Sequence, residues 1–266
     1  MKTLGGAKFL VTFLIISKIS AFPTKISKFG ARMSSLKSSS NPLTDLNLPS
    51  PLILGSGSFT RKLILKEMNI PFEIKTRPID ERAIGDRSKG SNPKELVLTL
   101  GKAKADHLVQ GLMDKAQENE GLRLPDSGEE WIVLTADQVV THSGCILEKP
   151  DDLEQAKDFV SRYAVSPPST VGSVVLTHLP SLIQVSGVDS SQINFNTSVS
   201  QCDLIERLVE EGAPVLNCAG GLMVEHPLVK DHIKGIDGTE DSVMGLSKDL
   251  VLRLLQEMKD KLDAER

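Results

Sequence analysis

Cysteine is scarce in this sequence, and its scarcity narrows the classes of protein to which the chain can belong. Among 266 residues there are three cysteines, Cys145, Cys202 and Cys218, and no two of them are closely spaced. This spacing favours neither a C-x-x-C zinc site nor a disulfide framework, and it fits a reducing compartment best. Apolar residues make up 39% of the chain and charged residues 25%, enough for one or two domains with a core. Disordered, collagen-like and disulfide-scaffold classes are therefore excluded.

Acidic residues are absent from the first 44 positions. The same segment carries seven cations: Lys2, Lys8, Lys18, Lys25, Lys28, Arg32 and Lys37. Without them the formal charge falls from -4 to -11. A body this acidic has no broad positive surface for polymeric nucleic acid, so we expect any phosphate group to bind in a local pocket.

The N-terminal segment has the pattern of a targeting leader. Its apolar run, residues 9–16, is too short to span a bilayer of about 30 Å and is typical of a signal-peptide core. The stretch after Phe22-Pro23 is rich in Ser, Lys and Arg, as in a transit peptide. The whole resembles the two-part leaders of plastids of secondary endosymbiotic origin, and a secretory or cytoplasmic destination is the alternative. We assign residues 1–44 to this leader and residues 45–266 to the mature domain.

Strands and helices alternate in the pattern that follows Pro49, which favours an α/β architecture. Strands are expected at residues 51–54, 131–135, 171–176 and 191–200. Helices are expected at residues 59–68, 93–109, 152–163 and 247–262, with a polar loop at residues 117–130. Ser58 and Asn92 are the expected caps of the first two helices, and Pro93 suits the first helical position. The sequence contains no evident repeat, coiled coil or membrane span.

A glycine-containing loop, Gly55-Ser56-Gly57-Ser58, joins the first expected strand to the first expected helix. At such a junction the backbone N–H groups and the helix dipole can receive phosphate oxygens, and Arg61 adds a forked cation in the first turn. The loop is not a Walker A motif, and Thr60 occupies the third glycine position of a dinucleotide fingerprint. A tight turn with a solvated arginine is the alternative.

Lys104 lies on the apolar face of the helix expected at residues 93–109. At about 100° per residue, this cation falls between Val97 and Leu100 on the apolar stripe. Lysine is rarely buried without a partner. Lys104 therefore either extends its ammonium group to solvent or meets an anion.

Asp137 follows the strand expected at residues 131–135 by two residues, at its carboxyl end. Ligands of open α/β sheets bind at that end, where a carboxylate can orient a metal ion or polarise a water; a helix or turn cap is the alternative. Lys149 and the pair Asp80-Glu81 are ordinary when taken singly. Taken together, these cations, carboxylates and the glycine loop are what a triphosphate and its magnesium ion require.

Six blocks occur in a fixed order over about residues 50–260. They are Leu-Gly-Ser-x-Ser-x-x-Arg, Ile-Asp-Glu, Lys-Ala-Lys-Ala, Thr-Ala-Asp-Gln, Glu-Lys-Pro, and Cys-Ala-Gly-Gly-Leu through Ser-Val-Met-Gly-Leu. This order resembles the Maf (septum-formation-like) family of nucleoside triphosphate pyrophosphatases. The resemblance implies a Maf/inosine-triphosphatase-like α/β fold, with two lobes around a bent mixed sheet and a central cleft, often as a homodimer.

The resemblance also implies an activity and a set of site residues. The activity is hydrolysis of the bond between the α- and β-phosphates of non-standard or modified nucleotides, with Mg²⁺ or Mn²⁺ as cofactor and no membrane partner in the mature form. The catalytic positions that match are Asp137, Asp80, Lys104 and Lys149, and the two aspartates also match metal-binding positions. The substrate-binding positions are Ser56, Ser58, Arg61, Gln138 and Glu225. In these roles the cations neutralise the triphosphate and Asp137 activates an in-line water.

Departures from the family pattern concern substrate choice. Thr60 stands where one branch has a second arginine and another a tryptophan. Gln138, Glu225 and the run Asn217-Cys218-Ala219-Gly220 look more like the branch associated with 7-methyl-GTP than the branch acting on dTTP and UTP. A carboxylate accepts two N–H donors from a guanine edge but finds no such pair on thymine or uracil. A guanine-type substrate such as 7-methyl-GTP is therefore favoured.

Other functions stay open at this point. A dTTP/UTP pyrophosphatase is one alternative, a non-catalytic nucleotide-binding regulator of division is another, and an oligomer-forming structural protein is a third. The intact set of Arg61, Lys104, Asp137 and Lys149 argues against a protein without turnover, because a sensor needs no water-activating acid beside its cations.

Overall fold

Seven β-strands form one mixed sheet in the structure, a computed structural model that describes residues 40–114, 130–200 and 203–266. The strands are β1 (Leu52–Leu54), β2 (Phe72–Ile74), β3 (Trp131–His142), β4 (Cys145–Leu147), β5 (Ser169–Leu179), β6 (Gln184–Phe195) and β7 (Ile233–Asp237). They lie in the order β2-β1-β3-β5-β6-β7, and β4 pairs with β3 outside this path. β1 pairs in parallel with β2 and β3, and the other pairs are antiparallel. This mixed sheet with its helices confirms the predicted α/β class.

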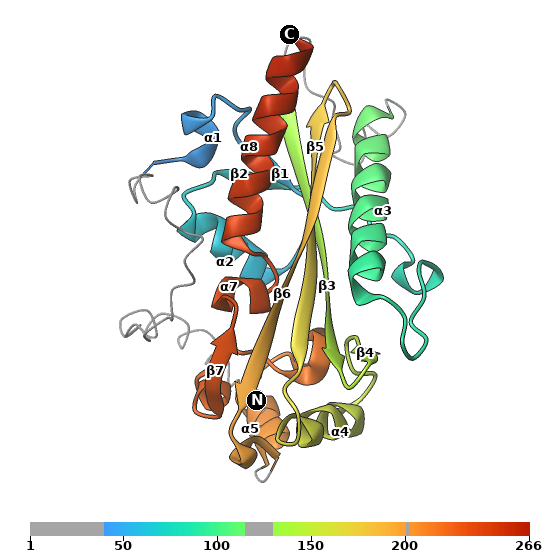
Figure 1. Cartoon of the computed structure of the whole chain (residues 1–266), viewed down its shortest axis with the longest axis vertical. Helices are drawn as coiled ribbons and strands as arrows, with labels where there is room; N and C mark the ends of the chain where they lie inside the picture. The colour runs from blue at the N-terminus through green and yellow to red at the C-terminus, as the bar shows by residue number, and fades with distance from the viewer. Residues whose placement is uncertain (1–39, 115–129, 201–202) are drawn as a thin grey trace, which may run out of the picture. The chain divides into compact units, whose positions relative to one another are not determined.

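Helices accompany the strands along the chain (Figure 1). They are α1 (Pro42–Asp45), α2 (Phe59–Glu67), α3 (Pro93–Met113), α4 (Leu153–Tyr163), α5 (Leu204–Glu210), α6 (Pro227–Lys230), α7 (Glu240–Val243) and α8 (Lys248–Glu265). The side chains of Ser58 and Asn92 cap α2 and α3, as predicted. None of the helices in the described parts of the chain is both long and apolar enough to cross a membrane.

α3 and α8 cover opposite faces of the long strands β3, β5 and β6 (Figure 1). Successive side chains of a strand point to opposite faces, and β5 shows the division clearly. The Ser173 hydroxyl donates to the Val97 carbonyl of α3 at 2.6 Å, whereas Val174 packs in the cluster that contains α8. Gly101 allows α3 to approach, because a Cβ at this position would lie 2.6 Å from Ser173 Oγ.

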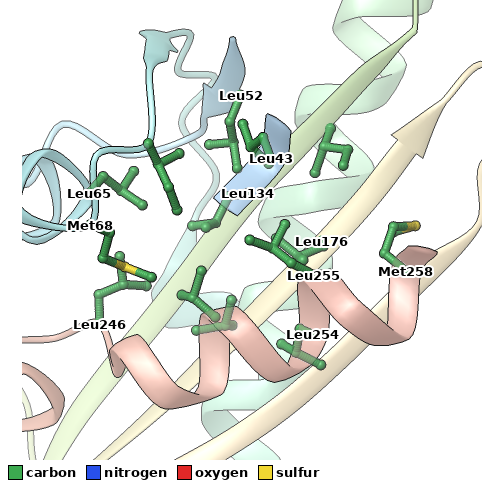
Figure 2. Close-up of a cluster of buried hydrophobic side chains, with 14 of the residues drawn as sticks. Leu43, Leu52, Leu65, Met68, Leu134, Leu176, Leu246, Leu254, Leu255 and Met258 are labelled. Carbon is green, nitrogen blue, oxygen red and sulfur yellow. The ribbon is translucent and has the colours of Figure 1, made fainter. Parts of the chain in front are cut away.

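A first hydrophobic core lies between α8, α2 and the sheet (Figure 2). Leu134 and Leu176 of the sheet meet Leu254 and Leu255 of α8 there, and each of these side chains is fully buried. Burying a leucine contributes about 1.5–3 kcal/mol. This core therefore anchors the strands that carry the candidate site.

Leu43 of α1 belongs to the same core and is also fully buried (Figure 2). α1 spans the predicted boundary between residues 44 and 45. The folded unit thus includes residues that the sequence analysis assigned to the leader, because an apolar side chain there fills the core. Residues 1–39 of the leader and residues 117–129 of the expected loop lie outside the described residues, and the leader assignment itself stays a prediction.

A second hydrophobic core lies at the other end of β3. Val140 and Leu147 of the β3–β4 hairpin pack there with Phe159 and Val160 of α4 and with Leu208 of α5. The two cores share no residue. They define the two lobes that the family resemblance implied.

Several predicted boundaries were wrong, and for the strands the reason is that pairing in the sheet overrode the local pattern. The strand expected at residues 131–135 continues to His142, since β5 pairs with it along its whole length. The strand expected at residues 191–200 begins at Gln184 and ends at Phe195, and Thr197–Ser200 is a 3₁₀ turn. α3 continues beyond residue 109 to Met113.

Candidate active site

A gap on one edge of β3 creates the candidate site. β1 pairs with β3 only as far as Leu134, where the Gly55 N–H donates to the Leu134 carbonyl at 2.8 Å. β4 occupies the same edge again from Val140 onward. Between these points no strand in the described parts of the chain pairs with β3 on that edge. A cavity of about 790 Å³ borders the gap, and residues of both lobes line it.

Asp137 lies inside the long strand β3 rather than after its carboxyl end, which corrects the predicted position. The parallel strand that does end here is β1, whose last residue is Leu54. Ligands of α/β sheets bind where parallel strands end, and the cavity does lie at the end of β1.

The glycine loop and Arg61 form one wall of the cavity. A Cβ on Gly55 would lie 2.7 Å from the Thr135 side chain, so only glycine fits where the chain leaves β1. Ser56 is buried, and its Oγ accepts hydrogen bonds from the Ser58 N–H at 3.3 Å and from Arg61 Nη1 at 3.1 Å. Ser58 lines the cavity but also uses its Oγ to cap α2.

The guanidinium of Arg61 is fixed by the backbone on either side of it. Nη1 also donates to the Ala136 carbonyl at 2.9 Å, and Nε donates to the Gly245 carbonyl at 3.0 Å. The Ala136 carbonyl is available because β1 stops before reaching it. Burial lowers the pKa of Arg61 while Asp137 and Glu81 raise it, and the group stays charged because arginine titrates far above neutral pH. Among the described residues Nη2 has no partner, so it can meet a ligand.

Two alternatives were predicted for the Lys104 side chain on α3, extension to solvent or contact with an anion. The structure shows that Lys104 contacts carboxylates. Its Nζ lies 2.5 Å from Asp137 Oδ1 and 2.9 Å from Glu81 Oε1. The Lys104 side chain is 18% exposed and that of Asp137 only 7%. The anions that Lys104 contacts are therefore carboxylates of the protein itself, at the border of the cavity that would hold a phosphate.

The buried carboxyl group of Asp137 experiences opposing influences. Burial raises its pKa most strongly, and Glu81 adds to this effect. Lys104 and Arg61 lower the pKa by favouring the carboxylate, yet the net direction is upward. A carboxylate with a raised pKa is a stronger base than an ordinary aspartate. Among the described residues Asp137 Oδ2 has no hydrogen-bond partner, so it can accept from a water.

Asp80 is not part of this cluster, contrary to its predicted role. Its side chain is exposed and accepts a hydrogen bond from the Arg82 N–H at 3.2 Å, which caps the 3₁₀ turn Glu81–Ala83. Capping directs Asp80 away, and its neighbour Glu81 lines the cavity instead. The sequence placed the two acids side by side, and the local turn decides which of them faces the site.

A second group of polar residues lines the cavity from the other lobe. Burial, with help from Glu225, raises the pKa of Cys218 to about 11, and Lys149 opposes this shift. All three residues line the cavity. Burial also raises the pKa of Glu225 itself. Among the described residues neither Glu225 nor Lys149 forms an ion pair, which leaves both charges available to a ligand. The structure brings them to the same cavity as Arg61, Lys104 and Asp137, and no ion pair among the described residues joins the two groups.

Gln138 also lines the cavity, but its amide is engaged elsewhere. Nε2 donates to the carbonyls of Ser242 and Val243 at 3.1 and 2.9 Å. Sequence reasoning missed these partners, together with the carbonyls of Ala136 and Gly245 that hold Arg61. Backbone acceptors have no signature in the sequence.

A metal ion would find two carboxylates in this cluster, Asp137 and Glu81. Mg²⁺ is commonly held by one or two carboxylates together with substrate phosphates. The described residues contain no group of three or more His, Cys, Asp or Glu side chains that could hold a metal ion. The donor set thus fits an ion that arrives with a polyphosphate, with Glu81 in the place predicted for Asp80.

Cations, a buried acid and a glycine loop that line one cavity are features of proteins that handle nucleotides, and comparison with known proteins specifies the family. Residues 51–258 match the family described as Maf-like protein, so the chain belongs to the Maf family, as the six blocks predicted. It is 33% identical over 208 residues to "7-methyl-GTP pyrophosphatase" of Dictyostelium discoideum, covering 78% of this chain and 97% of that protein.

Two bacterial relatives carry other names. The chain is 29% identical over 216 residues to "dTTP/UTP pyrophosphatase" of Salinibacter ruber, covering 81% of this chain and 94% of that protein. It is 31% identical over 204 residues to "Nucleoside triphosphate pyrophosphatase" of Synechococcus sp., covering 73% and 96%. All three relatives are matched over nearly their full length.

Proposed function

We propose that this protein is a nucleoside triphosphate pyrophosphatase that hydrolyses the bond between the α- and β-phosphates. The observation that carries the proposal is the convergence of Arg61, Lys104 and Asp137, from α2, α3 and β3, on one cavity. The names of the relatives support the same activity. The products are a nucleoside monophosphate and pyrophosphate.

Each side chain of the cluster has a separate role in this reaction. Arg61 Nη2 and Lys104 Nζ neutralise the phosphate oxygens, because hydrolysis at phosphorus depends largely on positioning and electrostatic stabilisation. Asp137 Oδ2 accepts a proton from a water as the water oxygen attacks the α-phosphorus. The bond from that phosphorus to the bridging oxygen breaks, and pyrophosphate leaves with that oxygen. Lys149 supplies a third cation from the opposite lobe.

We further propose Mg²⁺ or Mn²⁺ as the cofactor, held by Asp137 and Glu81 together with phosphate oxygens. When bound, such an ion neutralises phosphate charge and acidifies a water. Lys104 contacts both carboxylates, and its positive charge lowers the pKa of Asp137 against the larger effect of burial.

The proposed substrate is a guanine-type nucleotide such as 7-methyl-GTP. Glu225 lines the cavity without an ion-pair partner among the described residues, and a carboxylate can accept two N–H donors from a guanine edge. The Dictyostelium relative bears the name of this activity. The Salinibacter relative supports dTTP and UTP as the second candidate substrates.

A pyrophosphate-release assay with the purified protein tests the function. The panel contains 7-methyl-GTP, GTP, dTTP and UTP with Mg²⁺ or Mn²⁺. We expect turnover by the wild-type protein, strongest with 7-methyl-GTP, and none by Asp137→Asn. The control is Asp189→Asn, which changes a strand aspartate outside the cavity. Release by Asp137→Asn at the wild-type rate would remove this residue from the mechanism, and preference for a pyrimidine would overturn the role of Glu225.

Destination and assembly are separate proposals. We propose that residues 1–44 direct the protein to a plastid and that the mature domain forms a homodimer, as is common in the family. A fluorescent fusion of residues 1–44 tests the first, and a cytosolic signal would contradict both the plastid and the secretory alternatives. Light scattering of the purified protein tests the second, and a monomeric mass would refute it.

No turnover in the pyrophosphate-release assay would instead favour a non-catalytic role in the control of division.

A further inference from the structure

Gln138 points away from the catalytic acid that precedes it. Asp137 and Gln138 are successive residues of β3, so their side chains lie on opposite faces of the sheet. Asp137 meets Lys104 of α3, whereas Gln138 meets the carbonyls of Ser242 and Val243 in α7. A primary amide carries two N–H donors, and these two carbonyls take both of them.

The carbonyls that Gln138 contacts belong to a short helix, and the Ser242 carbonyl also accepts a hydrogen bond from the Gly245 N–H at 3.1 Å. α7 has four residues, and the last carbonyls of any helix lack partners within the helix. The Thr239 side chain caps its first turn, and Gln138 binds its last turn. The amide Oε1 is also close to the following glycine, because a Cβ on Gly245 would lie 2.9 Å from it.

The same turn fixes Arg61. The Gly245 carbonyl accepts the hydrogen bond from Arg61 Nε at 3.0 Å, three residues after the first carbonyl that Gln138 holds. Gly245 has a φ of 109°, a conformation that side-chain-bearing residues rarely adopt, so the direction of its carbonyl depends on this turn. A chain of contacts thus runs from Gln138 through residues 242–245 to the guanidinium.

We propose that Gln138 is a positioning residue that orients Arg61 through the turn at residues 242–245 and does not read the nucleobase. This inference rests on the proposed function, in which Arg61 Nη2 meets a phosphate. It revises the substrate-binding role predicted for Gln138, because the donors that would read a base are already used. It also gives the Ser-Val-Met-Gly-Leu block a role, because the backbone of this block holds Arg61.

A positioning residue and a base-reading residue differ in their kinetic signatures. Loss of a base contact changes the preference among nucleobases, because each base presents different donors and acceptors. Misplacement of Arg61 affects the triphosphate, which all substrates share. It therefore lowers turnover of every nucleotide by the same factor and leaves the preference unchanged.

The test compares Gln138→Met, which keeps the length of the side chain but has no N–H, with Gln138→Glu, which places a carboxylate against the carbonyls. Gln110→Glu, an exposed change on α3 outside the cavity, is the control. For 7-methyl-GTP, GTP, dTTP and UTP, we expect kcat of both Gln138 variants to fall about tenfold or more, with unchanged ratios among substrates. In an Arg61→Ala background, Gln138→Met should have little further effect, since both changes remove the same contact.

Hydrogen exchange gives a readout that does not depend on turnover. In Gln138→Met we expect amides of residues 242–246 to exchange at least tenfold faster, with protection of β3 and β5 retained. A changed preference among nucleobases, or unchanged exchange in this segment, would overturn the inference. An inert wild-type protein would refute the proposed function, and the exchange experiment would still decide whether Gln138 holds the turn.

Discussion

Replacing Lys104 by methionine tests the electrostatic core of the site without relying on turnover. The change keeps the length of the side chain and removes its charge. Asp137, whose side chain is 7% exposed, then loses a partner at 2.5 Å and keeps only the longer-range attraction of Arg61. The Glu81 side chain is 45% exposed, so hydration replaces most of the electrostatic attraction that it loses.

The magnitude follows from the burial of the pair. Breaking a buried ion pair by removing one partner costs about 3–5 kcal/mol, because the remaining charge is left without compensation. Lys104 keeps some contact with solvent, so we expect the lower end, about 3 kcal/mol at pH 7. In an Asp137→Asn background the buried carboxylate that Lys104 compensates is absent, and the same change should cost about 1 kcal/mol, mainly in lost hydrogen bonding.

Urea unfolding of the four proteins in this cycle measures the coupling directly. We expect the midpoint of Lys104→Met to fall while the m-value stays constant, and the two substitutions to be strongly non-additive. The control is Lys102→Met, which alters an exposed lysine on the same helix. A loss below about 1 kcal/mol for Lys104→Met, or costs that simply add, would refute the conclusion that these two charges depend on each other.

Two further predictions concern stability elsewhere in the fold. Leu43→Ala should lower the free energy of unfolding by about 2–5 kcal/mol in urea, because it opens a cavity in the first core, and a neutral effect would place α1 outside the folded unit. His178, 2% exposed on β5, has a pKa lowered mainly by burial, with Arg266 contributing, although Glu130 and Glu265 oppose the shift. The unfolded chain thus binds a proton at a higher pH than the folded one, so stability should decrease as the pH falls through about 6.5. His178→Gln should flatten this dependence in thermal unfolding curves, and an unchanged slope would contradict the assignment.

Local patterns predicted the elements that build the site, and the reasons are physical. Capping residues and apolar periodicity located α2 and α3, because both depend on neighbours within a few positions. The apolar stripe of α3 singled out Lys104 as a lysine that either reaches solvent or meets an anion, and its partners are Asp137 and Glu81.

Features that depend on distant pairing could not be predicted from the sequence. The length of β3 is set by β5, so Asp137 was placed after a strand that in fact contains it. Asp80 and Glu81 are adjacent acids, and only the 3₁₀ turn determines that Glu81 faces Lys104. The partners of Gln138 are backbone carbonyls 104 and 105 residues further along the chain, and no motif encodes them.

Hydrolysis in ¹⁸O-labelled water tests the central claim most directly, since the cleft is proposed to aim a water at the α-phosphorus. Mass spectrometry of the products reports which phosphorus the water attacked. We predict that the label enters the nucleoside monophosphate and that the released pyrophosphate stays unlabelled. Label in the pyrophosphate, or release of orthophosphate in its place, would contradict the account.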